Sequence, residues 1–441
     1  MKKAFLLRIA LTISALIPSS IFSQLPCNVL VGYWQSSWGT TVRLKDINSN
    51  YNVINIAFLE AGGGDGSSDN NNISALNFTA TNNSGLLADI PVLQAAGKKV
   101  LMSIGGGTGS FKLSSSADVT TLVNKVKTMI QTYGLDGIDI DLERSVYLSQ
   151  TSGGTVTSPE THISNVISAI QQLLTWYQST YGKKMLLTLV PEVAYTVGGL
   201  SDYMSKTYGV AYLPIIQTLS ADIDLVMVQL YNCSGGSYGL DNKVYYEATA
   251  DFIVSQTEAM IKGFTCLNSK GTYSGIDASK IAVCLPASSA AASSGYTTPA
   301  TVKSAINYLM GTGSKPGSYT LKTTGGYPAL KGMATWSVNT DLDGSYAYAT
   351  NYASIFTSCP TTAVNEISGN SFIAYPNPVA DQLRIDGLNG TGEKVILYNA
   401  LGQVVLQEIT TSNTMNLELS SLPAGFYTLQ VSNSSMKLMK N

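Results

Sequence analysis

The chain has 441 residues, of which 44% are hydrophobic and only 12% are charged, and its formal net charge is −2. This length exceeds one average domain, so we expect two domains. A chain without a basic patch is not suited to bind nucleic acid, and its one histidine, His162, cannot supply a histidine metal cluster or a Ser-His relay. The five cysteines have no metal-type spacing, and we therefore predict neither a metal site nor a cofactor.

Residues 1–23 have the features of a signal peptide. Two lysines near the start precede an apolar stretch from Ala4 to Ile17, and small or polar residues precede Gln24. The stretch is too short for a lasting membrane span, so we expect a secreted protein with no span after cleavage. Export permits disulfides, but five cysteines leave at least one thiol free if every bridge is intramolecular.

Residues 24–359 contain eight short β-branched runs, most of them separated by helical patterns. The predicted strands are Val29–Trp34, Val53–Phe58, Lys99–Ile104, Gly137–Glu143, Met185–Val190, Leu225–Tyr231, Lys280–Leu285 and Gly332–Trp336. The helical candidates are Asp89–Ala96, Thr121–Tyr133, His162–Tyr181, Thr249–Lys262 and Thr301–Met310. This alternation predicts a (β/α)₈ barrel of the α/β class, in which active residues lie at the C-terminal ends of the strands.

The fourth run, with the sequence DGIDIDLE, places three carboxylates at alternate positions. Side chains alternate between the faces of a strand, so Asp139, Asp141 and Glu143 should point the same way, about 6–7 Å apart. Like charges this close cannot all stay ionised cheaply, so at least one carboxyl should hold a proton near neutral pH, as a general acid requires. The alternative is an acidic edge strand that faces water. The other face of the run is apolar, which favours a strand covered on both sides.

The character of the chain changes after the predicted barrel. Residues 360–371 are polar and are predicted to be a linker, and residues 372–441 have no helical period. The strand candidates here are Leu383–Ile385, Lys394–Tyr398, Val404–Glu408, Thr414–Leu419 and Gly425–Val431. Separated by turn signals, they predict a small β-sandwich. Cys27 and Cys359 flank the barrel, whose closure should bring them together, and we expect a disulfide between them.

Two motifs point to a family. Ser103-Ile104-Gly105-Gly106 at the third strand and DGIDIDLE at the fourth strongly resemble glycoside hydrolase family 18, the chitinases and their relatives. The resemblance extends over roughly residues 29–341. It includes Gly32-Tyr33-Trp34, Pro191-Glu192, Gln229-Leu230-Tyr231-Asn232 and Trp336. The compact bacterial and plant branch is the most similar. No α+β insertion is evident before the eighth strand, and its absence implies a shallower groove than in other members.

The resemblance assigns catalytic roles. It implies that Glu143 is the proton donor and later the base that activates water. Because the nucleophile in this family is the 2-acetamido oxygen of the substrate, no enzyme nucleophile is needed. It implies that Asp141 stabilises the positive oxazolinium intermediate and that Asp139 shares a proton with Asp141. Residues predicted to be structural are Asp136 at the strand entrance and Ser103, Gly105 and Gly106 in the motif of the third strand.

The resemblance also implies substrate contacts. Tyr231 matches the tyrosine whose hydroxyl holds the acetamido carbonyl, and Trp336 matches the tryptophan at the barrel floor on which a sugar stacks. The other candidates for substrate binding are Gln229, Asn232, Tyr33 and Trp34. Loop hydrogen bonding remains open for Gln229 and Asn232, and core packing remains open for Trp34.

The leading hypothesis is a secreted, retaining chitinase that acts on chitin or chitooligosaccharides. The first alternative is an endo-β-N-acetylglucosaminidase, which uses the same chemistry on N-glycan cores. Leu142 and Arg144 on either side of Glu143 favour chitin. The second alternative is a non-catalytic chitin-binding lectin, which the presence of Glu143, Asp141 and Tyr231 disfavours.

The tail has a resemblance of its own. Its motifs are Tyr375-Pro376-Asn377-Pro378, Leu397–Gln403 and Leu422–Tyr427, with Lys437 and Lys440 near the end. They resemble the C-terminal sorting domains of the type IX secretion route. This implies the type IX machinery as a partner and the cell surface or the medium as the destination, by way of the periplasm. A sugar-binding module is the alternative, but residues 372–441 contain no tryptophan for stacking.

Overall fold

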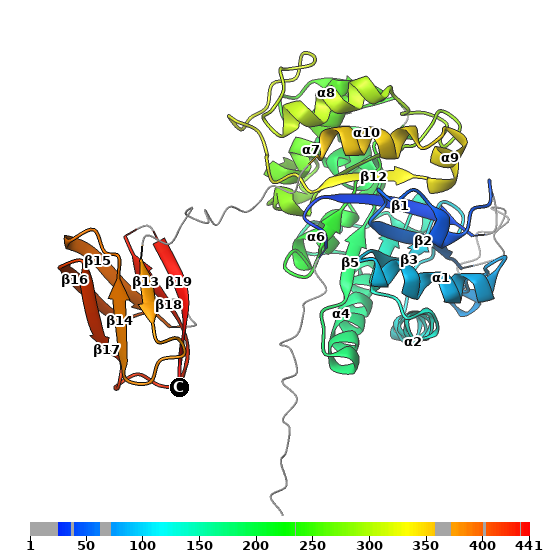
Figure 1. Cartoon of the computed structure of the whole chain (residues 1–441). Coiled ribbons are helices and arrows are strands. Elements are labelled where there is room, and N and C mark those ends of the chain that lie inside the picture. The colour runs from blue at the N-terminus through cyan, green and yellow to red at the C-terminus, as the bar shows by residue number, and fades with distance from the viewer. Residues whose placement is uncertain are drawn as a thin grey trace, which may run out of the picture. The chain divides into compact units, whose positions relative to one another are not determined.

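The computed structural model describes residues 25–36, 39–61, 72–233, 235–357, 372–399, 403–432 and 434–441. The predicted signal peptide, the predicted linker and Cys359 lie outside these residues. The chain divides into two compact units, Met1–Cys359 and Pro360–Asn441 (Figure 1). Each unit is described by itself below.

The first unit is built on eight parallel strands. They are β1 (Val29–Gln35), β2 (Val53–Leu59), β3 (Lys99–Gly105), β4 (Gly137–Asp141), β5 (Leu186–Leu189), β6 (Leu225–Val226), β11 (Ala282–Pro286) and β12 (Gly332–Trp336). Their order is β11-β12-β1-β2-β3-β4-β5-β6, and the parallel bridges Val226↔Ile281 and Gln229↔Cys284 join β6 to β11. The predicted (β/α)₈ barrel is therefore confirmed.

Alternation along the strands separates two apolar layers. One face of each strand packs inside the barrel, in a cluster that includes Val31, Leu101, Leu186 and Ala334. The other face packs against the helices, in a larger cluster that includes Ile54 and Ile140. Because both faces are covered, polar side chains that point inward are buried and need partners.

Ten α-helices follow or connect the strands in the described part of this unit. They are α1 (Asn83–Ala95), α2 (Ser116–Tyr133), α3 (Ser145–Leu148), α4 (Thr161–Tyr181), α5 (Asp202–Tyr208), α6 (Tyr212–Thr218), α7 (Ala250–Lys262), α8 (Pro299–Leu309), α9 (Val338–Asp343) and α10 (Ala347–Ile355). α2 begins with a capping box between Ser115 and Asp118, and Gly134 ends it in the left-handed conformation. α2 packs against α4 outside the barrel (Figure 1).

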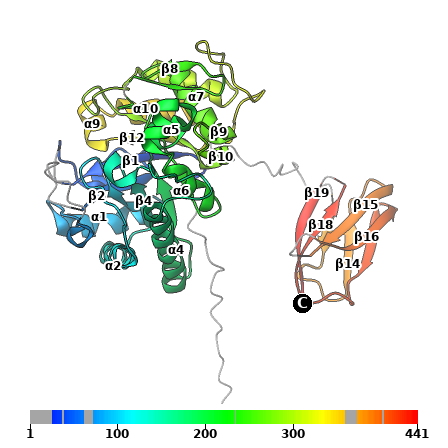
Figure 2. The ribbon, with the colours of Figure 1, turned by 180° about the vertical axis from the view of Figure 1, so that it is seen from behind.

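Several short elements were not predicted. They are the helices α3, α5, α6, α9 and α10 and two hairpins, β7 (Gly236–Tyr238) with β8 (Val244–Tyr246) and β9 (Phe264–Cys266) with β10 (Gly271–Tyr273). Strands of three residues are too short to produce a readable alternation. The hairpin β7–β8 follows β6, and it packs against α7 (Figure 2).

The second unit contains two antiparallel sheets, β13-β14-β17 and β16-β15-β18-β19. The strands are β13 (Ile373–Tyr375), β14 (Gln382–Asp386), β15 (Thr391–Tyr398), β16 (Val404–Thr411), β17 (Thr414–Glu418), β18 (Gly425–Val431) and β19 (Ser434–Lys440). Side chains such as Leu383, Leu397 and Leu429 form one buried core for both sheets. This all-β tail has the predicted strands plus β13 and β19.

Cys27 is disulfide-bonded, and Cys233, Cys266 and Cys284 are free thiols. The predicted partner, Cys359, lies outside the described residues, so the pairing stays a prediction. Within the described ranges, no helix is both long and apolar enough to cross a bilayer.

Candidate active site

The acidic side chains of β4 lie on one face of the strand and point into the barrel. Asp139 and Asp141 are both buried, and β4 ends at Asp141. Glu143, which we predicted inside the strand, lies in the loop just beyond it and is partly exposed. The carboxylates therefore run from the barrel interior to its C-terminal rim, where barrel enzymes bind substrate.

Asp139 is surrounded by hydroxyl donors. Tyr33 and Ser103 donate to its Oδ2 at 2.9 and 2.6 Å, and Thr188 donates to its Oδ1 at 2.6 Å. Burial raises the pKa of Asp139 to about 6, and these hydrogen bonds limit the rise. The three donors come from β1, β3 and β5, so Asp139 connects strands on both sides of β4.

Asp141 shares a hydrogen bond with Glu143 rather than with Asp139. Burial raises the pKa of Asp141 well above its usual range, and the charges of Glu143 and Asp139 raise it further. Burial also raises the pKa of Glu143, although hydrogen bonds from Gln229 and Asp141 lower it in part. The hydrogen bond of Asp141 is thus to Glu143, while Asp139 accepts from three hydroxyls. Proton sharing between Asp139 and Asp141 stays a prediction.

Gln229 holds the pair in place. Its Nε2 lies 3.1 Å from Oδ1 of Asp141, 3.0 Å from Oε1 of Glu143 and 3.1 Å from the carbonyl oxygen of Val190. One amide group therefore fixes the separation of the two carboxyls. In the structure Gln229 contacts the acids directly, which is a positioning role.

The loop that carries Glu143 is fixed by close backbone contacts. A Cβ atom on Gly105 would lie 2.2 Å from the carbonyl oxygen of Asp141, and Gly106 has a φ of +80°. The amide of Gly106 donates to that same oxygen at 2.7 Å, and Ser110 Oγ accepts from the amide of Glu143 at 2.7 Å. The two glycines thus allow the strand and the loop to touch, which is a structural role.

Tyr212, on α6, is a positioning residue that the sequence analysis missed. Its hydroxyl accepts from the amide of Leu142 at 2.7 Å and donates to the carbonyl oxygen of the same residue at 3.0 Å. It therefore holds the backbone between Asp141 and Glu143. A tyrosine in an undetected helix gave no sequence signal for this contact.

Glu192 is a further carboxyl beside the acid pair. It follows β5, and its backbone pairs with that of Gln229 in an isolated parallel bridge. Burial, and then the charge of Glu143, raise the pKa of Glu192 to about 8. Its position in a Pro-Glu pair after a strand was the only sequence signal.

Aromatic rings form the floor beside Asp139. The rings of Trp336 and Phe58 stack with centroids 5.6 Å apart, and Tyr33 lies 6.2 Å from Trp336. Trp336 is partly exposed, whereas Tyr33 is buried. A partly exposed ring at the end of β12 can stack on a sugar, whereas the buried Tyr33 donates its hydroxyl to Asp139.

Tyr231 lies inside the barrel and is nearly buried. Burial raises the pKa of its hydroxyl well above 10, and the charges of Cys284, Asp141 and Glu143 raise it further. The phenol is therefore neutral and can donate a hydrogen bond near the acid pair.

Three predicted residues, Asn232, Asp136 and Trp34, lie outside this cluster of acids. Asn232 has a φ of +54°, and its Oδ1 accepts from the amides of Ser293 and Ser294 at 3.0 and 3.2 Å, so it serves a loop. Asp136 lies at the opposite end of β4, where it accepts from the amide of Val100 at 3.0 Å, as expected of a structural residue.

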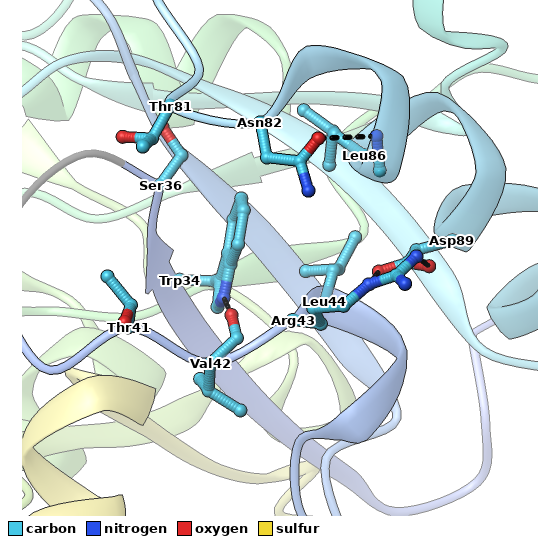
Figure 3. A pocket seen from close by; sticks show the side chains of 11 residues that line it. Trp34, Ser36, Thr41, Val42, Arg43, Leu44, Thr81, Asn82, Leu86 and Asp89 are labelled. Carbon is cyan, nitrogen blue, oxygen red and sulfur yellow. Dashed lines mark hydrogen bonds and ion pairs between the residues drawn. The ribbon is translucent and has the colours of Figure 1, made fainter.

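Trp34 points to the other side of β1 from Tyr33. It lines a pocket of about 210 Å³ outside the barrel, and its Nε1 donates to the carbonyl oxygen of Val42 at 3.0 Å (Figure 3). An ion pair between Arg43 and Asp89 lies in the same pocket wall. The carboxylates of β4 do not line this pocket. Adjacent residues of a strand face opposite ways, so Tyr33 points into the barrel towards Asp139 and Trp34 points away from it.

The arrangement can supply a general acid, because burial favours the protonated form of both Asp141 and Glu143. Two carboxyls share a hydrogen bond in a buried setting, a neutral phenol and an amide surround them, and a large ring forms the floor. The described residues contain no group of His, Cys, Asp and Glu side chains suited to hold a metal ion.

Comparison with known proteins identifies the relatives of both units. Residues 29–369 match the family model of the glycosyl hydrolases family 18, and residues 373–441 match that of a secretion system C-terminal sorting domain. The chain is 36% identical over 345 residues to Chitinase Chi52 of Paenibacillus xylanexedens, which covers 77% of this chain and 63% of that protein. It is 39% identical over 321 residues to Chitinase D of Niallia circulans, covering 71% and 58%.

A third relative includes the tail. The chain is 33% identical over 429 residues to Chitinase ChiA of Flavobacterium johnsoniae, covering 92% of this chain but 26% of that protein. The chain thus spans less than two thirds of the length of each of these three relatives.

Solved structures agree with the fold. A family GH18 chitinase from Chromobacterium violaceum has a TM-score of 0.64 at 31% identity, over 76% of this chain and 86% of that one. A putative Chitinase A from Streptomyces coelicolor has a TM-score of 0.57 at 27% identity, over 75% and 99%. With the barrel, the acidic strand and a family model that matches most of its length, the chain belongs to glycosyl hydrolase family 18.

Proposed function

We propose that the chain is a secreted, retaining chitinase that hydrolyses β-1,4 bonds between N-acetylglucosamine residues by substrate-assisted catalysis. The observation that carries the proposal is the hydrogen-bonded pair of Asp141 and Glu143, held by Gln229. The chitinase relatives support the choice of substrate.

The pair explains how a proton reaches the scissile bond. In the resting site Asp141, whose pKa is raised by burial and neighbouring charges, holds a proton against Glu143. When a sugar binds, the proton moves along this hydrogen bond to Glu143, which donates it to the glycosidic oxygen as the bond to the anomeric carbon breaks. Asp141 is then an anion beside the forming cation.

The substrate supplies the nucleophile. Its 2-acetamido oxygen attacks the anomeric carbon and forms the oxazolinium ion, whose N–H donates to Asp141. Tyr231 is a neutral phenol, so it can hold the acetamido oxygen in line. The Glu143 carboxylate then takes a proton from water as the hydroxyl adds to the anomeric carbon, and this restores the acid.

The test compares two substrates, chitohexaose and a high-mannose glycoprotein. We expect cleavage of chitohexaose, with the β-anomer first in proton NMR of fresh products. Glu143→Gln should abolish turnover and keep binding, because it removes the proton donor without changing the groove. Cleavage of the glycoprotein alone would favour an endo-β-N-acetylglucosaminidase, and binding without any cleavage would favour a lectin.

We also propose that the protein reaches the cell surface or the medium through the type IX machinery, after a signal peptide directs it to the periplasm. The match of residues 373–441 to a secretion sorting domain supports this route.

A further inference from the structure

Arg144 directly follows Glu143 and has a backbone conformation that suits glycine better than arginine. Its φ is +65° and its ψ is 115°. A non-glycine residue in this region costs free energy and is retained where its surroundings fix it. The carbonyl oxygen of Arg144 accepts from the amides of Tyr147 and Leu148, both at 3.1 Å, where α3 begins. The turn that leads from Glu143 into α3 is therefore fixed on its far side.

The side chain of Arg144 reaches the loop after β3. Its Nε donates to the carbonyl oxygen of Gly107 at 2.9 Å. The same loop accepts from the amide of Glu143 through Ser110 Oγ, and that hydroxyl donates to the carbonyl oxygen of Gly106 at 3.1 Å. The hydrogen bonds made by Glu143 and by the residue after it thus converge on one short loop.

This loop also lies against the carboxyl group of Glu143. A Cβ atom on Gly107 would lie 3.2 Å from Oε2 of Glu143, so the backbone of Gly107 borders the carboxyl. Arg144 binds the carbonyl oxygen of that same glycine. A change at Arg144 should therefore affect both the backbone that carries the carboxyl and the backbone beside it.

The charge of Arg144 differs in sign from that of its neighbours. The other groups that interact electrostatically with Glu143 are two carboxyls and three phenols, Asp141, Glu192, Tyr195, Tyr212 and Tyr231. Burial raises the pKa of all three phenols, so they stay neutral. Burial also raises the pKa of Glu143, whereas the positive charge of Arg144 lowers it in part.

We propose that Arg144 is a positioning residue that holds Glu143 against the loop after β3, and that its positive charge sets the upper pH limit of activity. The inference rests on the proposed function. The pair of Asp141 and Glu143 must carry a proton to donate, so activity ends where the pair loses that proton at high pH. A cation beside the pair favours this loss. Removing the cation should therefore extend activity to higher pH.

The test measures the pH dependence of kcat and kcat/KM for chitohexaose with the full-length protein. Arg144→Gln removes the charge and the Nε contact, so kcat at the optimum should fall about three- to tenfold and the alkaline limb should move up by about half a pH unit. Arg144→Lys keeps the charge but lacks Nε, so kcat should fall similarly while the limb stays within about 0.2 pH units of the wild type. KM should change less than about twofold in both, because Arg144 holds the acid and not the sugar.

Arg144→Gly separates positioning from backbone strain. Glycine accepts the positive φ, so this variant should unfold at a urea concentration no lower than the wild type, yet its kcat should fall as far as in Arg144→Gln. The control is Lys262→Gln, which removes an exposed cation in the last turn of α7. α7 precedes β11, so this turn lies at the other end of the barrel, and both kcat and the alkaline limb should be unchanged.

Two results would overturn the inference. An alkaline limb of Arg144→Gln that coincides with that of the wild type, or an equal shift in Arg144→Lys, would contradict the role of the charge. Wild-type kcat in Arg144→Gly would contradict the positioning role. A wild type that does not cleave chitohexaose would instead refute the proposed function.

Discussion

Replacing Glu192 by Gln should stabilise the barrel at alkaline pH and have a much smaller effect at acid pH. The carboxyl lies beside Glu143, and its pKa is raised from 4.5 to about 8 by burial and then by that neighbouring charge. In the folded protein it therefore keeps its proton up to about pH 8, whereas in the unfolded chain it ionises near 4.5. Its contribution to stability is complete below pH 4.5 and is lost as the pH rises to about 8.

The magnitude follows from this shift. One pKa unit corresponds to about 1.4 kcal/mol, so the full shift would correspond to about 5 kcal/mol. The side chain of Glu192 is only partly buried, so solvent screens part of this effect. We therefore expect about half of the 5 kcal/mol, roughly 2–3 kcal/mol. Glu192→Gln has no proton to lose, so the difference in unfolding free energy between variant and wild type should grow by that amount from pH 4.5 to 9.

Urea unfolding followed by tryptophan fluorescence can measure this difference. All four tryptophans, Trp34, Trp38, Trp176 and Trp336, precede residue 358, so the signal reports the barrel unit alone. Asp251→Asn is a control of opposite sign. Burial raises the pKa of Asp251, but hydrogen bonds from Ser318 and Tyr319 outweigh it and lower the pKa, so its difference from the wild type should stay constant above pH 5. A pH-independent difference for Glu192→Gln would refute the reasoning.

Three further predictions address the site, the disulfide and the tail. Gly295→Ala should lower activity and cost about 1–3 kcal/mol of stability, because the backbone at Gly295 favours glycine and a Cβ atom would collide with Tyr231. Activity assays and urea unfolding of the same variant can check both effects. Reduction of the Cys27 disulfide should destabilise the barrel by up to about 4–5 kcal/mol if its partner is Cys359, and non-reducing peptide mapping identifies that partner. Deletion of residues 372–441 should leave hydrolysis of soluble chitooligosaccharides unchanged and keep the protein in the periplasm of its host, and normal secretion of the shortened chain would contradict this.

Much of the architecture could be predicted from local patterns. The eight β-branched runs correspond to the eight barrel strands, and alternation in DGIDIDLE places Asp139 and Asp141 on the inner face. These features depend only on neighbours in sequence, because the side-chain period of a strand is two. Short elements such as the hairpin β7–β8 were missed because three residues carry too little pattern.

The partners of the acids depended on the tertiary structure. The sequence marked Asp139, Asp141 and Glu143 as a set that cannot all be ionised, but it could not indicate which carboxyls share a hydrogen bond. Three hydroxyls from β1, β3 and β5 occupy Asp139, and Gln229 holds Asp141 against Glu143. Those contacts join residues 36 to 106 positions apart, and only closure of the barrel brings them within hydrogen-bonding distance.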